Sequence, residues 1–147
     1  HYMYRKKLKA FAEQFEGVSV KFRCGVETFD VELRDLWKKG IPSSVTPEDV
    51  AKYFQGVCLL CCTQGDSKER ILNDIATAKQ HFEYFSVNLF CNNTTEVQRD
   101  EELAQWIINI TSITLWRYCS IKTKAQPLIN IINIYILYFI SRIECRE

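Results

Sequence analysis

The chain has 147 residues, enough for one domain with a hydrophobic core, and 13% of them are aromatic, which argues against disorder. The 19 Lys and Arg residues nearly balance the 18 Asp and Glu residues, so no basic surface supports nucleic-acid binding. The seven cysteines form no regular framework, and the first residues are charged rather than apolar. We therefore expect reduced thiols in a cytoplasmic protein.

The first elements in chain order are a helix and a strand. Apolar residues recur at helical spacing at Leu8, Phe11 and Phe15, so residues 3–16 predict a helix that ends near Gly17. Apolar and polar residues then alternate over 18–27, which predicts a strand with one apolar and one polar face.

Two further helices are predicted before the second strand. Asp30 is suited to cap a helix that carries Leu33, Leu36 and Trp37 and ends near Gly40. Thr46 comes just before Pro47 and two acidic residues, which is a strong helix-start pattern, and this second helix stops at Gly56.

The second half of the predicted domain repeats a strand-helix pattern. Residues 57–63 form a nearly continuous apolar run, as expected for a strand buried on both faces. A helix follows, with a predicted buried stripe of Ile71, Leu72, Ile75, Ala78 and Phe82. Residues 85–92 alternate as a third strand, and Asp100 caps a last helix through Leu103, Trp106 and Ile107.

Strands separated by helices indicate right-handed βαβ crossovers and a parallel sheet, so the predicted class is α/β with parallel βα repeats. Three strands would leave both edges of such a sheet open, which is a liability for an independent domain. The chain also begins with His1 rather than Met. We therefore expect a fragment of a larger barrel with further strands upstream.

The composition changes after residue 106. Residues 107–147 contain 12 Ile, whereas residues 1–106 contain only Ile41, Ile71 and Ile75. We consequently divide the chain into a barrel-like part, 1–106, and an atypical Ile-rich tail, 107–147. Three interpretations of the tail remain open: a frameshift into AT-rich sequence, a genuine extension, and a membrane anchor. The apolar stretch 128–140 is shorter than the roughly 20 residues of a spanning helix, which argues against the anchor.

Three segments resemble the radical S-adenosylmethionine (SAM) superfamily. Residues 20–30, with Arg34 and Lys39-Gly40, look like its fourth barrel strand and the following turn. Residues 56–69 are similar to the fifth strand and its loop, and residues 87–103 to the sixth strand and its helix. The resemblance implies the C-terminal half of a (β/α)6 partial TIM-type barrel, with SAM and a 4Fe-4S cluster bound by the intact parent enzyme.

The resemblance does not extend to the half of the barrel that binds the iron–sulfur cluster. The family motif C-x3-C-x2-C is absent, because Cys58 and Cys62 have the first spacing but Gly65 takes the third position. In a continuous strand, Cys58 and Cys62 would share one face and Cys61 would point to the other, so the three thiolates would not converge. We expect no metal ligand and no catalytic residue in this chain.

Candidate site residues follow from the parallel sheet, because ligands bind at the carboxyl ends of its strands. The polar face of each strand should point toward the inside of the barrel. Taken together with the resemblance, this implies six SAM-binding candidates: Arg23, Glu27, Thr28, Gln64, Asn88 and Asn92. Glu27 leads, because a carboxylate there is able to accept hydrogen bonds from a ribose diol. The alternatives are an ion pair of Glu27 with Arg23 or Lys21, and turn-forming roles for Thr28 and Asn92.

The sequence thus favours a fragment that supplies part of the SAM pocket and of the substrate wall, and that is inactive alone. The expected partners are SAM and a substrate that the sequence does not specify. A non-catalytic α/β binding module, membrane-associated through the tail, is the alternative from another class. A different (β/α) barrel enzyme with other upstream chemistry is the second alternative.

Overall fold

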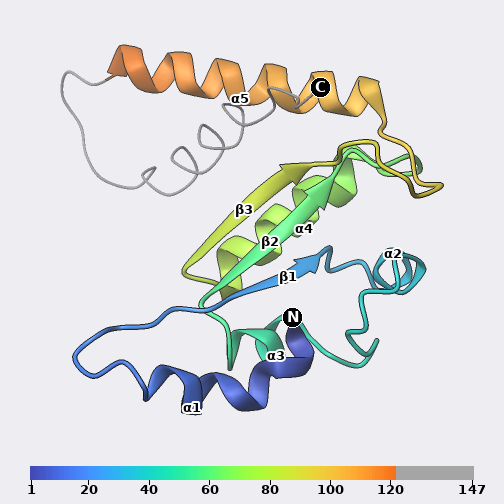
Figure 1. Ribbon diagram of the computed structural model, residues 1–147. Helices are drawn as coiled ribbons and strands as arrows, with labels where there is room; N and C mark the ends of the chain where they lie inside the picture. Colours follow the sequence, from blue (N-terminus) through green and yellow to red (C-terminus); the bar gives the residue numbers. More distant parts are fainter. Residues whose placement is uncertain (122–147) are drawn as a thin grey trace.

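The computed structural model describes residues 1–121, and it describes side chains as far as residue 111. Its centre is a parallel sheet with the strand order β1-β2-β3 (Figure 1). The strands are β1 (Arg23–Glu27), β2 (Gly56–Cys61) and β3 (Tyr84–Leu89), and both neighbouring pairs are parallel. The predicted parallel α/β class is confirmed, and closure into a wider barrel stays a prediction.

Helices occupy the connections between the strands, as right-handed crossovers require. They are η1 (Tyr2–Lys7), α1 (Leu8–Ala12), α2 (Val31–Leu36), α3 (Pro47–Ala51), α4 (Lys68–His81) and α5 (Glu101–Ile121). The longest connecting helix, α4, lies along one face of the sheet, behind β2 and β3 in Figure 1. We refer to this face as the helix face and to the opposite side as the second face.

The main core lies between the helix face and the helices. Alternate strand residues point into it: Cys24 and Val26 of β1, Val57 and Leu59 of β2, and Phe85 of β3. The helices and loops contribute Tyr2, Ile41, Val50, Phe54, Ala78 and Phe82. A second cluster lies under α5 and consists of Cys61, Cys62, Ile71, Leu103, Ala104 and Ile107. The two clusters together fix α4 and α5 against the sheet.

The N-terminal helix and the first strand are both shorter than predicted. The predicted helix over 3–16 is divided into the 3-10 helix η1 and a single short α-helix that ends at Ala12. Phe11 in α1 and Phe15 beyond it are largely exposed, and the Phe11 ring contacts the rings of Phe15 and Phe22 instead of entering the core. The predicted strand over 18–27 begins only at Arg23, and Val18 is 62% exposed, outside the core that the described residues form.

Two helical faces also differ from the prediction. Leu72, placed on the buried stripe of α4, is 50% exposed, and Asp74 is buried in its stead. Leu36, one of the apolar residues of the predicted helix after Asp30, is 70% exposed, whereas Arg34 is buried. The Arg34 guanidinium donates hydrogen bonds to the carbonyls of Pro42 and Val45. Polar contacts of Arg34, and not an apolar contact of Leu36, thus hold the loop after α2 against this helix.

The predicted helix starts are confirmed. Asp30 accepts a hydrogen bond from the Leu33 amide at 2.9 Å and caps α2. Asp100 accepts one from the Leu103 amide at 2.9 Å at the start of α5. Thr46 and Asp49 form a reciprocal capping box at the start of α3, with Pro47 at the first turn.

Replacement of Thr46 by Ala is expected to lower the free energy of unfolding by about 1 kcal/mol, because it leaves a helix amide without its acceptor. Chemical denaturation measures this change. Ser43→Ala is the matched control, since Ser43 is exposed in the preceding loop and caps no helix. Equal losses in the two variants would contradict the capping role.

The tail begins inside a helix. α5 continues through residue 106, the expected boundary, to Ile121. The apolar stretch 128–140 lies outside the described residues. Among the helices that the structure describes, none is long and apolar enough to cross a membrane.

Candidate functional site

The second face of the sheet carries the polar and small residues of the strands. Register pairs Gly25 with Cys58 and Cys58 with Ser86, so these three residues form one row across the sheet. Two residues closer to the carboxyl ends, and on the same face, Leu60 is paired with Asn88. Because residues in register on parallel strands share a face, this side combines a shallow row of small residues with amide and carboxylate groups near the strand ends.

Glu27 ends β1 in an unusual conformation. Its φ is 71°, in the left-handed region that residues other than glycine seldom adopt, and the register of β1 against β2 shifts between Gly25 and Glu27. A Cβ added to Gly25 would lie 3.2 Å from Oε1 of Glu27, so the carboxylate folds back over the small-residue row. Strained residues of this kind concentrate at functional sites.

The carboxylate of Glu27 has one ionic partner among the described residues. Nζ of Lys39 lies 3.4 Å from Oε1, and the two side chains are 31% and 20% exposed. The sequence alternatives for this partner, Arg23 and Lys21, are both wrong. Lys21 pairs with Glu83, and Arg23 starts β1 at its amino end, away from the ion pair. Glu27 therefore forms its ion pair at the carboxyl edge of the sheet.

Ser86 contributes an unpaired polar atom on the same face. It is 9% exposed, and its buried Oγ has no hydrogen-bond partner within the described part of the chain. Buried hydroxyl groups without a partner are uncommon and costly. Together with Gly25, which leaves room beside Cys58, this hydroxyl fits a polar ligand that approaches the sheet closely.

The remaining predicted residues are distributed around the strand ends. Asn88 is half-buried on β3, and its carbonyl accepts a hydrogen bond from the Cys61 thiol. Asn92 is exposed in the loop after β3, where Oδ1 accepts from the Arg99 amide at 2.7 Å. Gln64 is exposed after β2, and its amide donates to the Gln98 carbonyl at 2.7 Å. The structure thus brings Glu27 and Asn88 to one edge, with Gln64 and Asn92 in the loops beyond.

Thr28 belongs to the interior and not to the surface of this edge. It is fully buried, and its Oγ1 accepts hydrogen bonds from the Asp30 amide and from Nη1 of Arg70, both at 3.0 Å. This arrangement matches the turn-forming alternative considered for Thr28.

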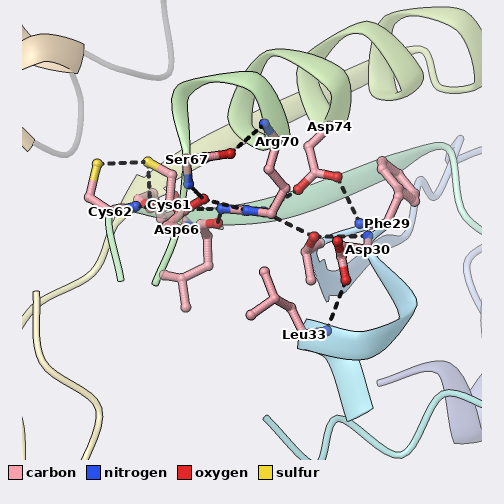
Figure 2. Close-up of polar contacts among 12 residues, drawn as sticks. Phe29, Asp30, Leu33, Cys61, Cys62, Asp66, Ser67, Arg70 and Asp74 are labelled. Atoms are coloured by element: carbon pink, nitrogen blue, oxygen red, sulfur yellow. Dashed lines mark hydrogen bonds and ion pairs between the residues drawn. The ribbon is translucent and has the colours of Figure 1, made fainter. Parts of the chain in front are cut away.

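Arg70 is the centre of a buried polar network that the sequence analysis missed (Figure 2). Its guanidinium is held by the carboxylates of Asp66 and Asp74, the hydroxyl of Thr28 and the carbonyl of Leu60. These five hydrogen bonds use all five N–H groups of the arginine. The three charged side chains are each 10% exposed or less.

The network joins the loops after two neighbouring strands. Asp74 accepts a hydrogen bond from the Phe29 amide at 2.9 Å, after β1. Asp66 accepts one from the Cys62 amide at 2.9 Å, after β2. Arg70 and Asp74 both project from α4, so one helix fixes the carboxyl ends of β1 and β2 relative to each other. We name this set, Thr28, Asp66, Arg70 and Asp74, the Arg70 network.

Charge in the network is unequal, with one cation and two carboxylates. Burial raises the pKa of Asp74 above its usual value, an effect that the hydrogen bond from the Phe29 amide partly offsets. Burial alone would lower the pKa of Arg70, but the hydrogen bond and the charge of Asp66 raise it overall. The guanidinium therefore stays charged and compensates the carboxylates.

The described residues do not fit an iron–sulfur cluster. They contain no group of three or more His, Cys, Asp or Glu side chains that could hold a metal ion. The cysteines near β2 also differ from the sequence expectation, because Cys62 lies beyond the strand with φ at 65° and its thiol meets that of Cys61. Cys58 is on the second face, so the three thiols still do not converge.

Comparison with known proteins supports the fold assignment. No protein-family model matches this chain, and neither does a curated protein sequence. Among solved structures, a queuine lyase from Clostridium spiroforme bound to SAM and queuine is similar, with a TM-score of 0.67 and 36% sequence identity. This similarity supports a radical SAM-like fold. It covers 72% of this chain and 46% of the lyase, so the chain spans less than half the length of that protein.

One feature of the Arg70 network is visible in the sequence. Asp66, Arg70 and Asp74 are spaced by four residues, and side chains at that spacing meet on one side of a helix. The spacing alone did not reveal burial, because most such pairs are exposed to solvent. The unpaired hydroxyl of Ser86 had no signal beyond its place on the polar face.

Proposed function

We propose that this chain supplies the C-terminal part of a SAM-dependent radical enzyme, and that the carboxyl edge of its sheet forms part of the SAM pocket and of the substrate wall. The observation that carries the proposal is the folded-back carboxylate of Glu27 at the end of β1. The similarity to a lyase bound to SAM supports it. The edge is where parallel α/β folds bind ligands.

Within this proposal, Glu27 accepts hydrogen bonds from a diol such as the SAM ribose. An ionised carboxylate accepts about four hydrogen bonds, and the ion pair with Lys39 uses only part of that capacity. Lys39 positions the carboxylate over Gly25. The Ser86 hydroxyl gains its missing partner from the ligand, and Asn88 offers an amide next to it.

The substrate proposed for the longer enzyme is a planar base related to queuine, which the similar lyase binds together with SAM. The small-residue row Gly25-Cys58-Ser86 supports this, because it lets a flat ring approach the sheet. The 4Fe-4S cluster expected from the resemblance would be held by residues outside this chain, and we assign no reaction step to the chain itself. Alone, it binds without catalysis.

Titration of the full chain with SAM, followed by NMR of backbone amides, tests the role of Glu27. We expect the largest shifts at Gly25, Glu27 and Asn88. Glu27→Gln should weaken SAM binding about 10- to 100-fold, because hydrogen bonds to charged groups contribute about 1.5–3 kcal/mol.

Glu83→Gln is the matched control for charge, since Glu83 is an exposed carboxylate paired with Lys21 at the other end of the sheet. It should leave SAM binding unchanged. If Glu27→Gln alters stability but not SAM binding, the ion pair with Lys39 is structural and the proposed role is wrong. If SAM shifts no amide of the second face, the chain is better described as a non-catalytic α/β module.

A further inference from the structure

Two adjacent thiols converge at the end of β2. Cys61 is the last residue of the strand, and successive side chains of a strand point to opposite faces. Cys62 instead has φ at 65°, which turns its side chain back toward that of Cys61. The two Sγ atoms lie 3.6 Å apart. Figure 2 shows the two thiols side by side, joined by a dashed line. Both residues are at most 1% exposed.

The backbone holds this pair in place without any ligand. The Cys62 amide donates to Oδ2 of Asp66 at 2.9 Å, and the Cys62 carbonyl accepts from the Asp100 amide at 2.8 Å. Asp66 is itself bound by Arg70, so the left-handed turn at Cys62 is fixed by the Arg70 network. The thiol pair is therefore preorganised, which lowers the entropic cost of binding a group with both sulfurs.

A disulfide bond between Cys61 and Cys62 is geometrically unfavourable. Consecutive Cα atoms are about 3.8 Å apart across a trans peptide, whereas disulfides usually join Cα atoms about 4.4–6.8 Å apart. A disulfide between neighbours would thus be strained. A single thiophilic atom that bonds both sulfurs needs no sulfur–sulfur bond, and it suits two sulfurs that already lie near van der Waals contact.

The thiols differ in acidity. The pKa of Cys62 is lowered, mainly by the hydrogen bond between its thiol and that of Cys61. The pKa of Cys61 is raised by the same hydrogen bond and by burial. The pair thus combines a more nucleophilic sulfur with a neighbour that retains its proton.

We propose that Cys61 and Cys62 form a bidentate binding site for trivalent arsenicals, a class of soft, thiophilic ligands. With an organic arsenic(III) oxide, two As–S bonds form and the As–O bond is lost. The oxygen leaves as one water molecule with the two thiol protons, and arsenic stays trivalent, so no oxidant or reductant is needed. This site is independent of the function proposed above.

Access to the site requires a local opening of α5. Leu103, Ala104 and Ile107 of that helix pack over the two thiols. Binding should therefore be slow in the native chain and limited by this opening. Once bound, the ligand also removes the hydrogen bond from the Cys61 thiol to the Asn88 carbonyl, next to the candidate SAM site.

The test uses the full chain with Cys91, Cys119 and Cys145 replaced by Ser, so that distant thiols do not compete. The probe is phenylarsine oxide, followed by intact mass and by protection from alkylation after unfolding. We expect one adduct per chain, with Cys61 and Cys62 protected. Cys61→Ser or Cys62→Ser should weaken binding about 100-fold or more, because a second tethered contact adds about 10²–10⁴ in affinity.

Cys58→Ser is the matched control and should leave binding unchanged, since Cys58 lies on the second face, away from the pair. Leu103→Ala should accelerate adduct formation by loosening the cover over the thiols. Retention of tight binding in Cys61→Ser would overturn the proposal. So would the absence of an adduct in the Leu103→Ala chain, where limited access no longer explains it. Neither result depends on SAM binding.

Discussion

Replacement of Arg70 by Met is expected to lower the free energy of unfolding by about 3–5 kcal/mol, the usual cost of removing one partner from a buried ion pair. The methionine leaves the Asp66 and Asp74 carboxylates without their cation, although both are almost fully buried. It also removes donors from Thr28 and from the Leu60 carbonyl. Because domains are marginally stable, a loss of this size removes a large part of the total free energy of unfolding.

Urea denaturation followed by circular dichroism measures the effect. Arg99→Met is the matched control, because Arg99 pairs with Glu101 near the surface, and such pairs contribute about 0–1 kcal/mol. Further replacement of both Asp66 and Asp74 by Asn in the Arg70→Met chain should recover part of the loss, since it removes the unpaired charges. A cost for Arg70→Met as small as that for Arg99→Met would show that the network is not a stabilising centre.

A loss of stability at alkaline pH is expected from Cys24. Burial raises the pKa of this thiol from 9.0 to about 11, so the unfolded chain ionises first as the pH rises. The folded chain then binds more protons than the unfolded chain between those values. The stabilising contribution is complete below pH 9 and is lost as the pH rises toward 11, by about 3 kcal/mol for a two-unit difference.

Urea titrations at pH 8, 9, 10 and 11 measure this slope, and Cys24→Ala should make it shallower. The comparison between variants matters, because other groups titrate in the same range and Cys61 is also a buried thiol with a raised pKa. Cys91→Ala is the control, since Cys91 is exposed in the loop after β3. An unchanged slope in Cys24→Ala would contradict the assigned cause.

Features that depend on local chemistry were predictable from the sequence. The caps at Asp30, Thr46 and Asp100 were found because a short polar side chain before a helix has one main use. The parallel order of the strands followed from the alternation of apolar runs with helical patterns. These signals act over a few residues and need no knowledge of the tertiary structure.

Features that depend on distant contacts were not predictable. Whether Val18, Leu36 or Leu72 is buried depends on whether another element covers it, and within the described residues all three side chains stay at least half exposed. The partner of Glu27 is Lys39, because the loop after α2 returns to the end of β1. The left-handed turn at Cys62 exists because Asp66 holds its amide, and an apolar run alone suggests a continuing strand.

The segment after β3 has a practical consequence for engineering. Its base is closed by the hydrogen bond between Asn92 and Arg99 and by the bridge between Arg99 and Thr63, while the residues between, at Thr94 and Thr95, are exposed. A loop that is fixed at its base and exposed at its tip tolerates inserted sequence. A fluorescent reporter or a capture peptide inserted between Thr94 and Thr95 would replace only the local turn in which Thr95 donates to Asn93. It would lie beside the carboxyl edge of the sheet and leave the contacts at the base of the loop intact.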